Sequence, residues 1–159
     1  VLIPQVVDAV KIPVIAAGGI ADGRQMAASL ALGADAVQIG SRFAATLESS
    51  AHDNFKKAIL AATPASTMLV MKKSVPVRLL KNKFYEDVAK LEERGATAEE
   101  LEALLGKGRA KAGMLDGDLE QGELEIGQVS GMIKDIPTCN DLVQRLLSEY
   151  ENAVKRLPH

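Results

Sequence analysis

The sequence predicts an α/β fold in which two short parallel strands and their connecting helix precede a mainly helical extension. Between Val14 and Ile39, two uninterrupted apolar runs flank one amphipathic helix, as in a βαβ unit whose strands are buried. Both runs end at glycine, in Gly18-Gly19 and in Gly40-Ser41. After Phe43 the apolar residues recur with helical spacing.

The first elements follow from local signals. Leu2–Val10 has helical apolar spacing, and the chain then becomes extended at Pro13. Val14–Ala17 predicts a strand that is buried on both faces. The next helix is expected to begin after an Asp22 cap, and the second strand spans residues 34–39.

The later elements are mostly helices. A helix through 54–60 is expected to be capped by Ser49 or Ser50, and Thr97 with Glu100 forms a capping-box pattern before another helix. The remaining predicted elements are a short strand at 67–71, extended chain at 74–78, a helix at 84–94, glycine-punctuated turns at 116–131 and a final helix after Thr138. We therefore divide the chain into a barrel part (1–63), a mostly helical lid or insert (64–137) and a C-terminal helix (138–159).

Composition and charge exclude several classes. The chain has 159 residues, 47% hydrophobic and 25% charged, with a net charge of −2, which favours a globular domain and disfavours nucleic acid as a partner. One cysteine, Cys139, excludes an internal disulfide and fits a reducing cytoplasm. Two histidines, His52 and His159, disfavour a histidine metal site, and no apolar run is long enough to predict a membrane span.

The two glycine turns predict a phosphate-binding site. The carboxyl ends of neighbouring parallel strands share one edge, and glycine there lets a ligand approach the backbone. Gly18 and Gly19 would present N–H groups beside the start of a helix, whose dipole favours an anion. Gly40 and Ser41 would add backbone and a hydroxyl donor. In barrels of eight βα units, the phosphate site is often built by the loops after the last two strands.

Other polar residues have open interpretations. In a buried strand, Gln38 needs a partner, which is either a cofactor or a neighbouring strand end. Arg42 is either a phosphate ligand or a surface ion pair. His52 is best explained as a helix cap or surface residue, since no nucleophile or carboxylate surrounds it in sequence. A basic run is either a solvated face or a contact for an acidic carrier or phosphorylated cofactor; it contains Lys72, Lys73, Arg78, Lys81 and Lys83.

Several segments together resemble one family. These are I-P-V-I-A-A-G-G-I-A-D-G and L-A-L-G-A-D-A-V-Q-I-G-S-R-F, followed by E-S-S-A-H-D-N-F-K-K-A-I-L, P-V-R-L-L-K-N-K-F and G-D-L-E-Q-G-E-L-E-I-G-Q-V-S-G-M-I. They resemble the C-terminal part of the nitronate monooxygenase and enoyl-ACP reductase II family of FMN-dependent (β/α)8 TIM barrels. The resemblance implies that the chain holds the last two strands of such a barrel.

The resemblance also implies a set of cofactor-binding residues. Gly18 and Gly19 match the flavin-phosphate loop after strand seven of the family. The second FMN segment, after strand eight, matches Gln38, Ile39, Gly40 and Ser41, where Ser41 replaces a common threonine. The family's active-site histidine lies in an upstream Gly-Gly-His region that has no counterpart here, so no catalytic residue and no metal ligand is expected in this chain.

The branch of the family stays open at this stage. The A-H-x-N-[FY]-K segment and the glycine-spaced tail are most similar to enoyl-ACP reductase II, in which NADH or NADPH reduces FMN and an enoyl thioester on acyl-carrier protein is then reduced. The alternative is nitronate monooxygenase, with a small nitronate as substrate. An alternative of another class is a non-redox phosphate-binding barrel of the IMP dehydrogenase type. A cytoplasmic homodimer is expected in either flavin-dependent case.

The chain starts at Val-Leu-Ile-Pro without an initiator methionine, which suggests an internal boundary. Two strands cannot close a barrel, so the remaining N-terminal half of the barrel is expected as a partner. We expect the segment alone to lack tight FMN binding and activity, because the flavin ring would miss most of its walls.

Overall fold

A computed structural model describes residues 1–156, which form two compact units. Unit 1 contains residues 1–48 and the chain from Ile136 onward, and unit 2 is the continuous segment 49–135. The C-terminal helix thus belongs to the same unit as the two strands, whereas the divisions expected from the sequence lie at 63/64 and 137/138. Positions 157–159 of the predicted final helix, with His159, lie outside the described residues.

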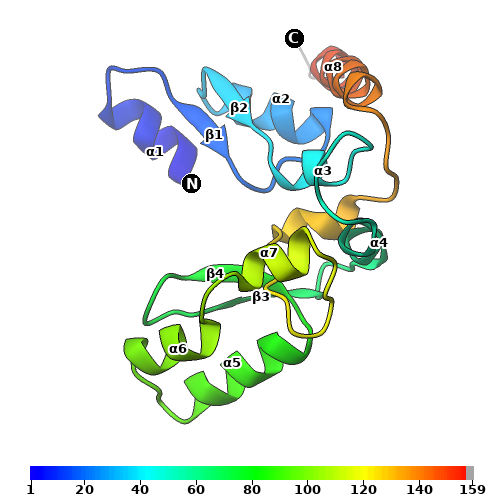
Figure 1. The fold of residues 1–159 in the computed structure, drawn as a ribbon. Helices are drawn as coiled ribbons and strands as arrows, with labels where there is room; N and C mark the ends of the chain where they lie inside the picture. The colour runs from blue at the N-terminus through cyan, green and yellow to red at the C-terminus, as the bar shows by residue number, and fades with distance from the viewer. Residues whose placement is uncertain (157–159) are drawn as a thin grey trace. The chain divides into compact units, whose positions relative to one another are not determined.

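Unit 1 contains the predicted βαβ segment, drawn in blue and cyan in Figure 1. Its elements are α1 (Leu2–Ala9), β1 (Ile15–Ala17), α2 (Gly23–Ala31), β2 (Ala36–Gln38), α3 (Ser41–Ala44) and α8 (Cys139–Lys155). β1 and β2 are parallel neighbours, with Ile15 paired with Ala36 and Ala17 paired with Gln38. The predicted adjacent parallel strands are confirmed, and their carboxyl ends lie at one edge.

The two faces of this small sheet differ in burial. Ala16 packs on one face in a cluster with Ile20 and Ala34, supported by partly buried residues that include Ile39. On the other face Ile15 is 60% exposed, and Ala17, Ala36 and Gln38 are exposed as well. The prediction of burial on both faces is therefore wrong for the described residues. Ile3 of α1 packs against the buried cluster and α2 contacts β2, whereas the side chains on the other face stay exposed in the described chain.

Helix α8 is the longest helix described, and it packs against α2. The predicted Thr138 cap is confirmed, because its hydroxyl accepts a hydrogen bond from the Asp141 N–H at 3.0 Å. Leu142 and Leu146 bury one face of the helix. Pairing of apolar faces explains why this distant segment returns to unit 1.

Unit 2 contains a β-hairpin among helices, where the sequence indicated a mostly helical region. Its elements are α4 (Asp53–Ala61), β3 (Thr67–Val70), β4 (Val77–Leu80), α5 (Lys83–Glu93), α6 (Ala98–Leu105), α7 (Arg109–Met114) and the 3-10 helix η1 (Gln128–Met132). β3 and β4 pair antiparallel, and β4 also bridges Glu125 on its other side. The predicted short strand thus exists, and the extended chain after it supplies its partner.

The core of unit 2 lies between the hairpin and the helices α5 and α6. Its buried residues are Val70, Met71, Leu79, Phe84, Val88, Ala96 and Leu101. The predicted Thr97–Glu100 capping box is present at the start of α6, with both reciprocal hydrogen bonds formed. Arg109 lies over the Phe84 ring, 4.5 Å from its centroid, and adds a cation–π contact.

The cap of α4 differs from the prediction. His52, and not Ser49 or Ser50, is the N-cap, and its Nδ1 accepts a hydrogen bond from the Asn54 N–H at 3.1 Å. The His52 N–H donates to the Met114 carbonyl at 2.8 Å, which fixes the residue against α7. The expected structural role of His52 is therefore confirmed, and the serines lie too early in the chain to reach the first turn.

We expect His52→Ala to destabilise unit 2 by about 1 kcal/mol, because the Asn54 N–H loses its acceptor. His52→Asp keeps a side-chain acceptor at the cap, so it is expected to retain most of that stability. Urea denaturation of the two variants measures the difference. Equal losses in both variants would contradict the capping role and would assign the effect to ring packing against Gly117.

Candidate functional site

The two predicted glycine turns come together at one edge of the β1–β2 sheet. Ala17 and Gln38 are paired in the ladder. Gly18 follows Ala17 directly, and Gly40 lies two residues after Gln38. Neighbouring strands lie about 4.8 Å apart, so both turns can contact one phosphate-sized group. The structure thus supplies the geometry on which the phosphate prediction depends.

Both turns leave their backbone open. Gly18 and Gly19 have φ values of 94° and 71°, a region that favours glycine. A Cβ atom at either position, or at Gly40, would meet nothing within 4 Å. The N–H groups of Gly19 and Gly40 donate to no acceptor among the described residues. Two amide donors at this edge are therefore available to an anion.

Gly40 is the more informative of these residues, because its conformation does not require glycine. Its φ is −103° and its surroundings are open. Neither positive φ nor a close neighbour in the described chain accounts for the missing side chain. Glycine is a favoured N-cap residue, and the missing side chain also leaves the backbone at this turn open to a ligand.

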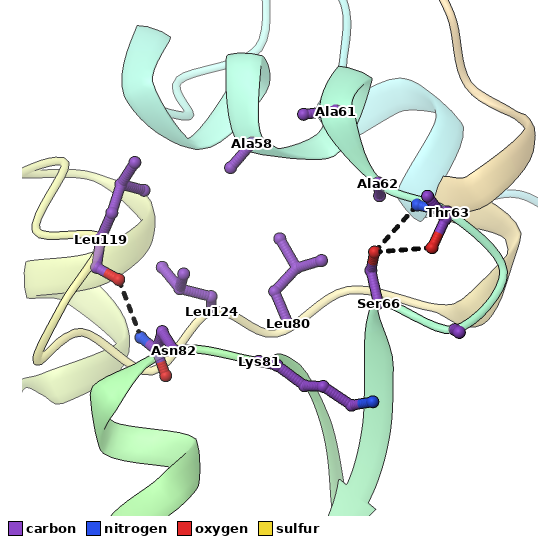
Figure 2. Close-up of a pocket in the computed structure, with 11 residues that line it drawn as sticks. Ala58, Ala61, Ala62, Thr63, Ser66, Leu80, Lys81, Asn82, Leu119 and Leu124 are labelled. Carbon is purple, nitrogen blue, oxygen red and sulfur yellow. Dashed lines mark hydrogen bonds between the residues drawn. The ribbon is translucent and has the colours of Figure 1, made fainter.

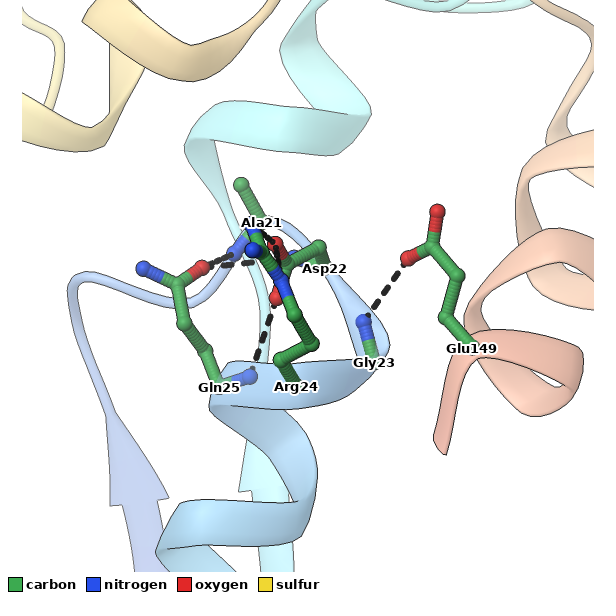
Figure 3. Close-up of polar contacts among 6 residues, drawn as sticks. All are labelled: Ala21, Asp22, Gly23, Arg24, Gln25 and Glu149. Atoms are coloured by element: carbon green, nitrogen blue, oxygen red, sulfur yellow. Dashed lines mark hydrogen bonds and ion pairs between the residues drawn. The ribbon is translucent and has the colours of Figure 1, made fainter. Parts of the chain in front are cut away.

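The amide groups at the start of helix α2 already have acceptors within unit 1. Figure 3 shows that protein groups already accept from its first amides. Asp22 accepts from the Gln25 N–H at 2.9 Å, and the Gln25 side chain accepts from the Ala21 N–H at 2.8 Å. The Gly23 N–H donates to the Glu149 carboxylate of α8, also at 2.9 Å. A phosphate would thus use the turn amides and not the helix terminus.

Charges around this capped terminus are balanced locally. Burial alone would raise the pKa of Asp22, but hydrogen bonds from Arg24 and from the Gln25 amide outweigh it and lower that pKa. The Arg24 guanidinium pairs with the same carboxylate at 2.5 Å. Sequence reasoning missed Glu149, which lies 126 residues from its partner Gly23, and no local pattern signals such a contact.

The remaining predicted site residues differ in placement. Ser41 is the first residue of α3, and Gly40 is the N-cap of that helix. Gln38 is exposed on the uncovered face of the sheet, contrary to the expected buried strand. Ile39 packs against the small core and offers its backbone to a site. Arg42 is 4% exposed and donates to the Ala45 carbonyl, so it is not a surface ion pair.

Most side chains of the basic run make hydrogen bonds or ion pairs within unit 2. Lys73 donates to the Gly95 and Ala96 carbonyls at 2.9 Å, Arg78 donates to Thr67, and Lys83 pairs with Asp87. These contacts do not support an open basic face. Among residues 1–156, no cluster of side chains is arranged to hold a metal ion, and no helix is long and apolar enough to cross a membrane.

The fold and the paired glycine turns define the class of the protein: an α/β chain that matches the C-terminal portion of TIM-barrel oxidoreductases, with two open glycine turns at the carboxyl ends of neighbouring strands. The family model described as nitronate monooxygenase matches residues 1–149. The chain belongs to the nitronate monooxygenase family.

Solved structures share this fold. FabK from Thermotoga maritima is 38% identical, with a TM-score of 0.91 over 98% of this chain and 50% of that chain. Nitroalkane oxidase from Streptomyces ansochromogenes is also 38% identical, with a TM-score of 0.78 over 98% of this chain and 44% of that one. The likeness extends through both units, since nearly the whole chain is covered.

A curated relative adds a thioester substrate to the comparison. The (3aS,4S,5R,7aS)-5-hydroxy-7a-methyl-1-oxo-octahydro-1H-indene-4-carboxyl-CoA dehydrogenase of Rhodococcus jostii is 34% identical, over 98% of this chain and 54% of its own length. The chain therefore spans about half the length of the curated relatives that it matches over nearly all its residues.

Proposed function

We propose that this chain supplies the phosphate-binding part of an FMN-dependent oxidoreductase. The open backbone at Gly19 and Gly40 carries the proposal, because two donor amides at the same sheet edge have no acceptor from the described chain. Gly18 shapes the first turn through its positive φ, and Ser41 places a hydroxyl beside the second. Amide and hydroxyl donors are the groups that hold a phosphate without requiring a cation.

The uncovered face of the sheet suits the rest of the cofactor. Gln38 lies on the same face as Ala17, its partner in the ladder, and the side chain is exposed there. Residues on this face point into the interior when such strands belong to a closed barrel. Gln38 is therefore proposed to hydrogen-bond the ribityl chain or ring. When bound, FMN would supply the redox chemistry, while these residues bind and orient it.

We propose enoyl-ACP reductase II as the activity, with NADH or NADPH as reductant and an enoyl thioester on acyl-carrier protein as substrate. The TM-score of 0.91 with FabK supports this choice. The CoA thioester in the name of the Rhodococcus relative supports a thioester substrate more generally. The proposal places the protein in the cytoplasm.

Nitronate monooxygenase is the second candidate. The family model described as nitronate monooxygenase favours this candidate. The nitroalkane oxidase favours it too, because this chain is 38% identical to that protein and to FabK alike. Membership of this family weighs against a non-redox barrel of the IMP dehydrogenase type.

The remaining N-terminal half of the barrel is the proposed structural partner. Ile15 is 60% exposed on the open sheet face, and Leu2 and Ile12 are each 72% exposed in the same unit. Closure of the sheet into a barrel would enclose the face that carries Ile15, and further helices of the barrel would pack beside α1. We propose that the completed barrel forms a homodimer.

The activity is tested on the protein that carries this chain. We expect the purified protein to be yellow and to oxidise NADH or NADPH when crotonyl thioester is added. Oxygen uptake with a nitronate, in the absence of thioester-dependent oxidation, would instead favour the second candidate. A colourless protein that binds no added FMN would contradict both.

A further inference from the structure

Unit 2 contains a cavity that the proposed flavin site does not use. It has a volume of about 450 Å³ and lies between α4 and the chain around the end of β4 (Figure 2). This volume is in the range of small-molecule pockets. All its lining residues belong to unit 2, so its shape is independent of how the two units are arranged.

The walls of this cavity are aliphatic. Ala58, Ala61 and Ala62 lie on one face of the α4 segment, at spacings of three and four residues. Opposite them, Leu80 and Leu124 project toward the helix in Figure 2. Protein interiors normally fill such a space with interlocking side chains. Alanine on the helix side leaves it open, as an apolar slot.

Two polar side chains that line the cavity already have hydrogen-bond partners within the protein. The Asn82 side-chain amide is fully occupied, because it donates to the Leu119 and Gly122 carbonyls and its oxygen accepts from the Tyr85 N–H. The Ser66 hydroxyl accepts from the Thr63 N–H at 2.9 Å.

The Lys81 side chain differs from these groups. It is exposed beside the cavity, and its ammonium group contacts no acceptor among residues 1–156. Only its backbone N–H is held, by the Ser66 carbonyl at 3.0 Å. Lys81 thus brings one available positive charge, on a long exposed side chain that extends toward β3 in Figure 2, to the set of residues that line the slot.

We propose that this cavity binds an amphiphile with an unbranched alkyl chain and a single anionic head. The chain would lie between the alanine face of α4 and the two leucines, where burial of methylene groups is favourable. The head, a carboxylate or a phosphate, would pair with the Lys81 ammonium at the rim. The inference does not depend on flavin binding, because no residue of the glycine turns takes part.

Calorimetric titration of the protein that carries this chain tests the proposal, with decanoate, decyl phosphate and decanol as probes. We expect saturable binding of at least one anion, and binding of decanol that is weaker by up to about fivefold, the upper end of the range for an exposed ion pair. The comparison of decanoate with decyl phosphate identifies the preferred head. Equal binding of decanol, or no saturable binding of either anion, would overturn the proposal.

Two variants locate the binding. Lys81→Gln is expected to reduce anion affinity to that of decanol and to leave decanol unchanged, while Lys57→Gln, on the same unit but not lining the cavity, changes neither. Ala58→Leu fills the slot and is expected to weaken every probe by about tenfold or more. Ala61→Leu serves the same purpose if the first variant melts early. Unchanged binding in folded slot-filling variants would show that the probes bind elsewhere.

Discussion

Gly23→Ala is expected to cost unit 1 about 3 kcal/mol or more of folding free energy. A Cβ atom at this position would lie 2.5 Å from Glu149 Cβ and 2.5 Å from the Leu146 carbonyl oxygen, and closer still to the Tyr150 nitrogen. Two of these three atoms are backbone of α8, so rotation of a side chain cannot relieve the clash. Alanine favours a helix by about 1 kcal/mol over glycine, which is too little to compensate.

Urea denaturation of the protein that carries this chain measures the loss, with Gly40→Ala as the matched control. Gly40 has a negative φ and no neighbour within 4 Å of an added Cβ, so its variant is expected to fold within about 0.5 kcal/mol of the wild type. If Gly23→Ala were equally benign, the close packing of α8 on α2 would be contradicted.

Gly19→Val is expected to weaken FMN binding more than Ser41→Ala. Loss of a hydroxyl donor to a phosphate costs about 1.5–3 kcal/mol. Valine at position 19 would place a branched side chain where the ligand approaches, and it would also disfavour the observed φ of 71°. The turn then loses the position of its free amide in addition to the space beside it, so an effect above about 3 kcal/mol is expected.

Flavin fluorescence titration compares the two variants, and Gly95→Val controls for backbone strain. Gly95 has a φ of 83°, an open surrounding and a place in unit 2, at the end of α5. Valine there carries a similar conformational cost without approaching the glycine turns. Normal FMN affinity in Gly19→Val, or a loss of the same size in Gly95→Val, would remove the support for the phosphate-binding role.

Elements defined by neighbouring residues could be predicted from the sequence. The βαβ unit follows from two apolar runs that flank a helix, and the structure confirms its parallel pairing. The caps at Asp22, Thr97 and Thr138 are correct because each depends on a side chain and an amide three residues apart. The position of both glycine turns at one edge follows from the same local argument.

Contacts between distant residues were not predictable in this way. β3 and β4 lie on either side of the segment that contains Pro76, and their antiparallel register is not set by a local sequence signal. β4 is a strand because it pairs with β3 on one side and bridges Glu125 on the other. The sequence gives no reason for glycine at position 23, directly after the Asp22 cap. The close packing of α8 explains why no side chain fits there. The burial of Arg42 likewise depends on its tertiary surroundings, since its short helix carries no such signal.

The return of α8 to unit 1 has a consequence for the order of folding during synthesis. The chain leaves unit 1 after Glu48 and re-enters it at Ile136, and the two crossings are joined by hydrogen bonds from the Leu47 N–H to the Pro137 carbonyl and from the Cys139 N–H to Glu48. Unit 2 is continuous, so it can fold on the ribosome before α8 has been translated. The Glu149 contact that completes the start of α2, next to the glycine turns, therefore cannot form until α8 has been translated, after the whole of unit 2.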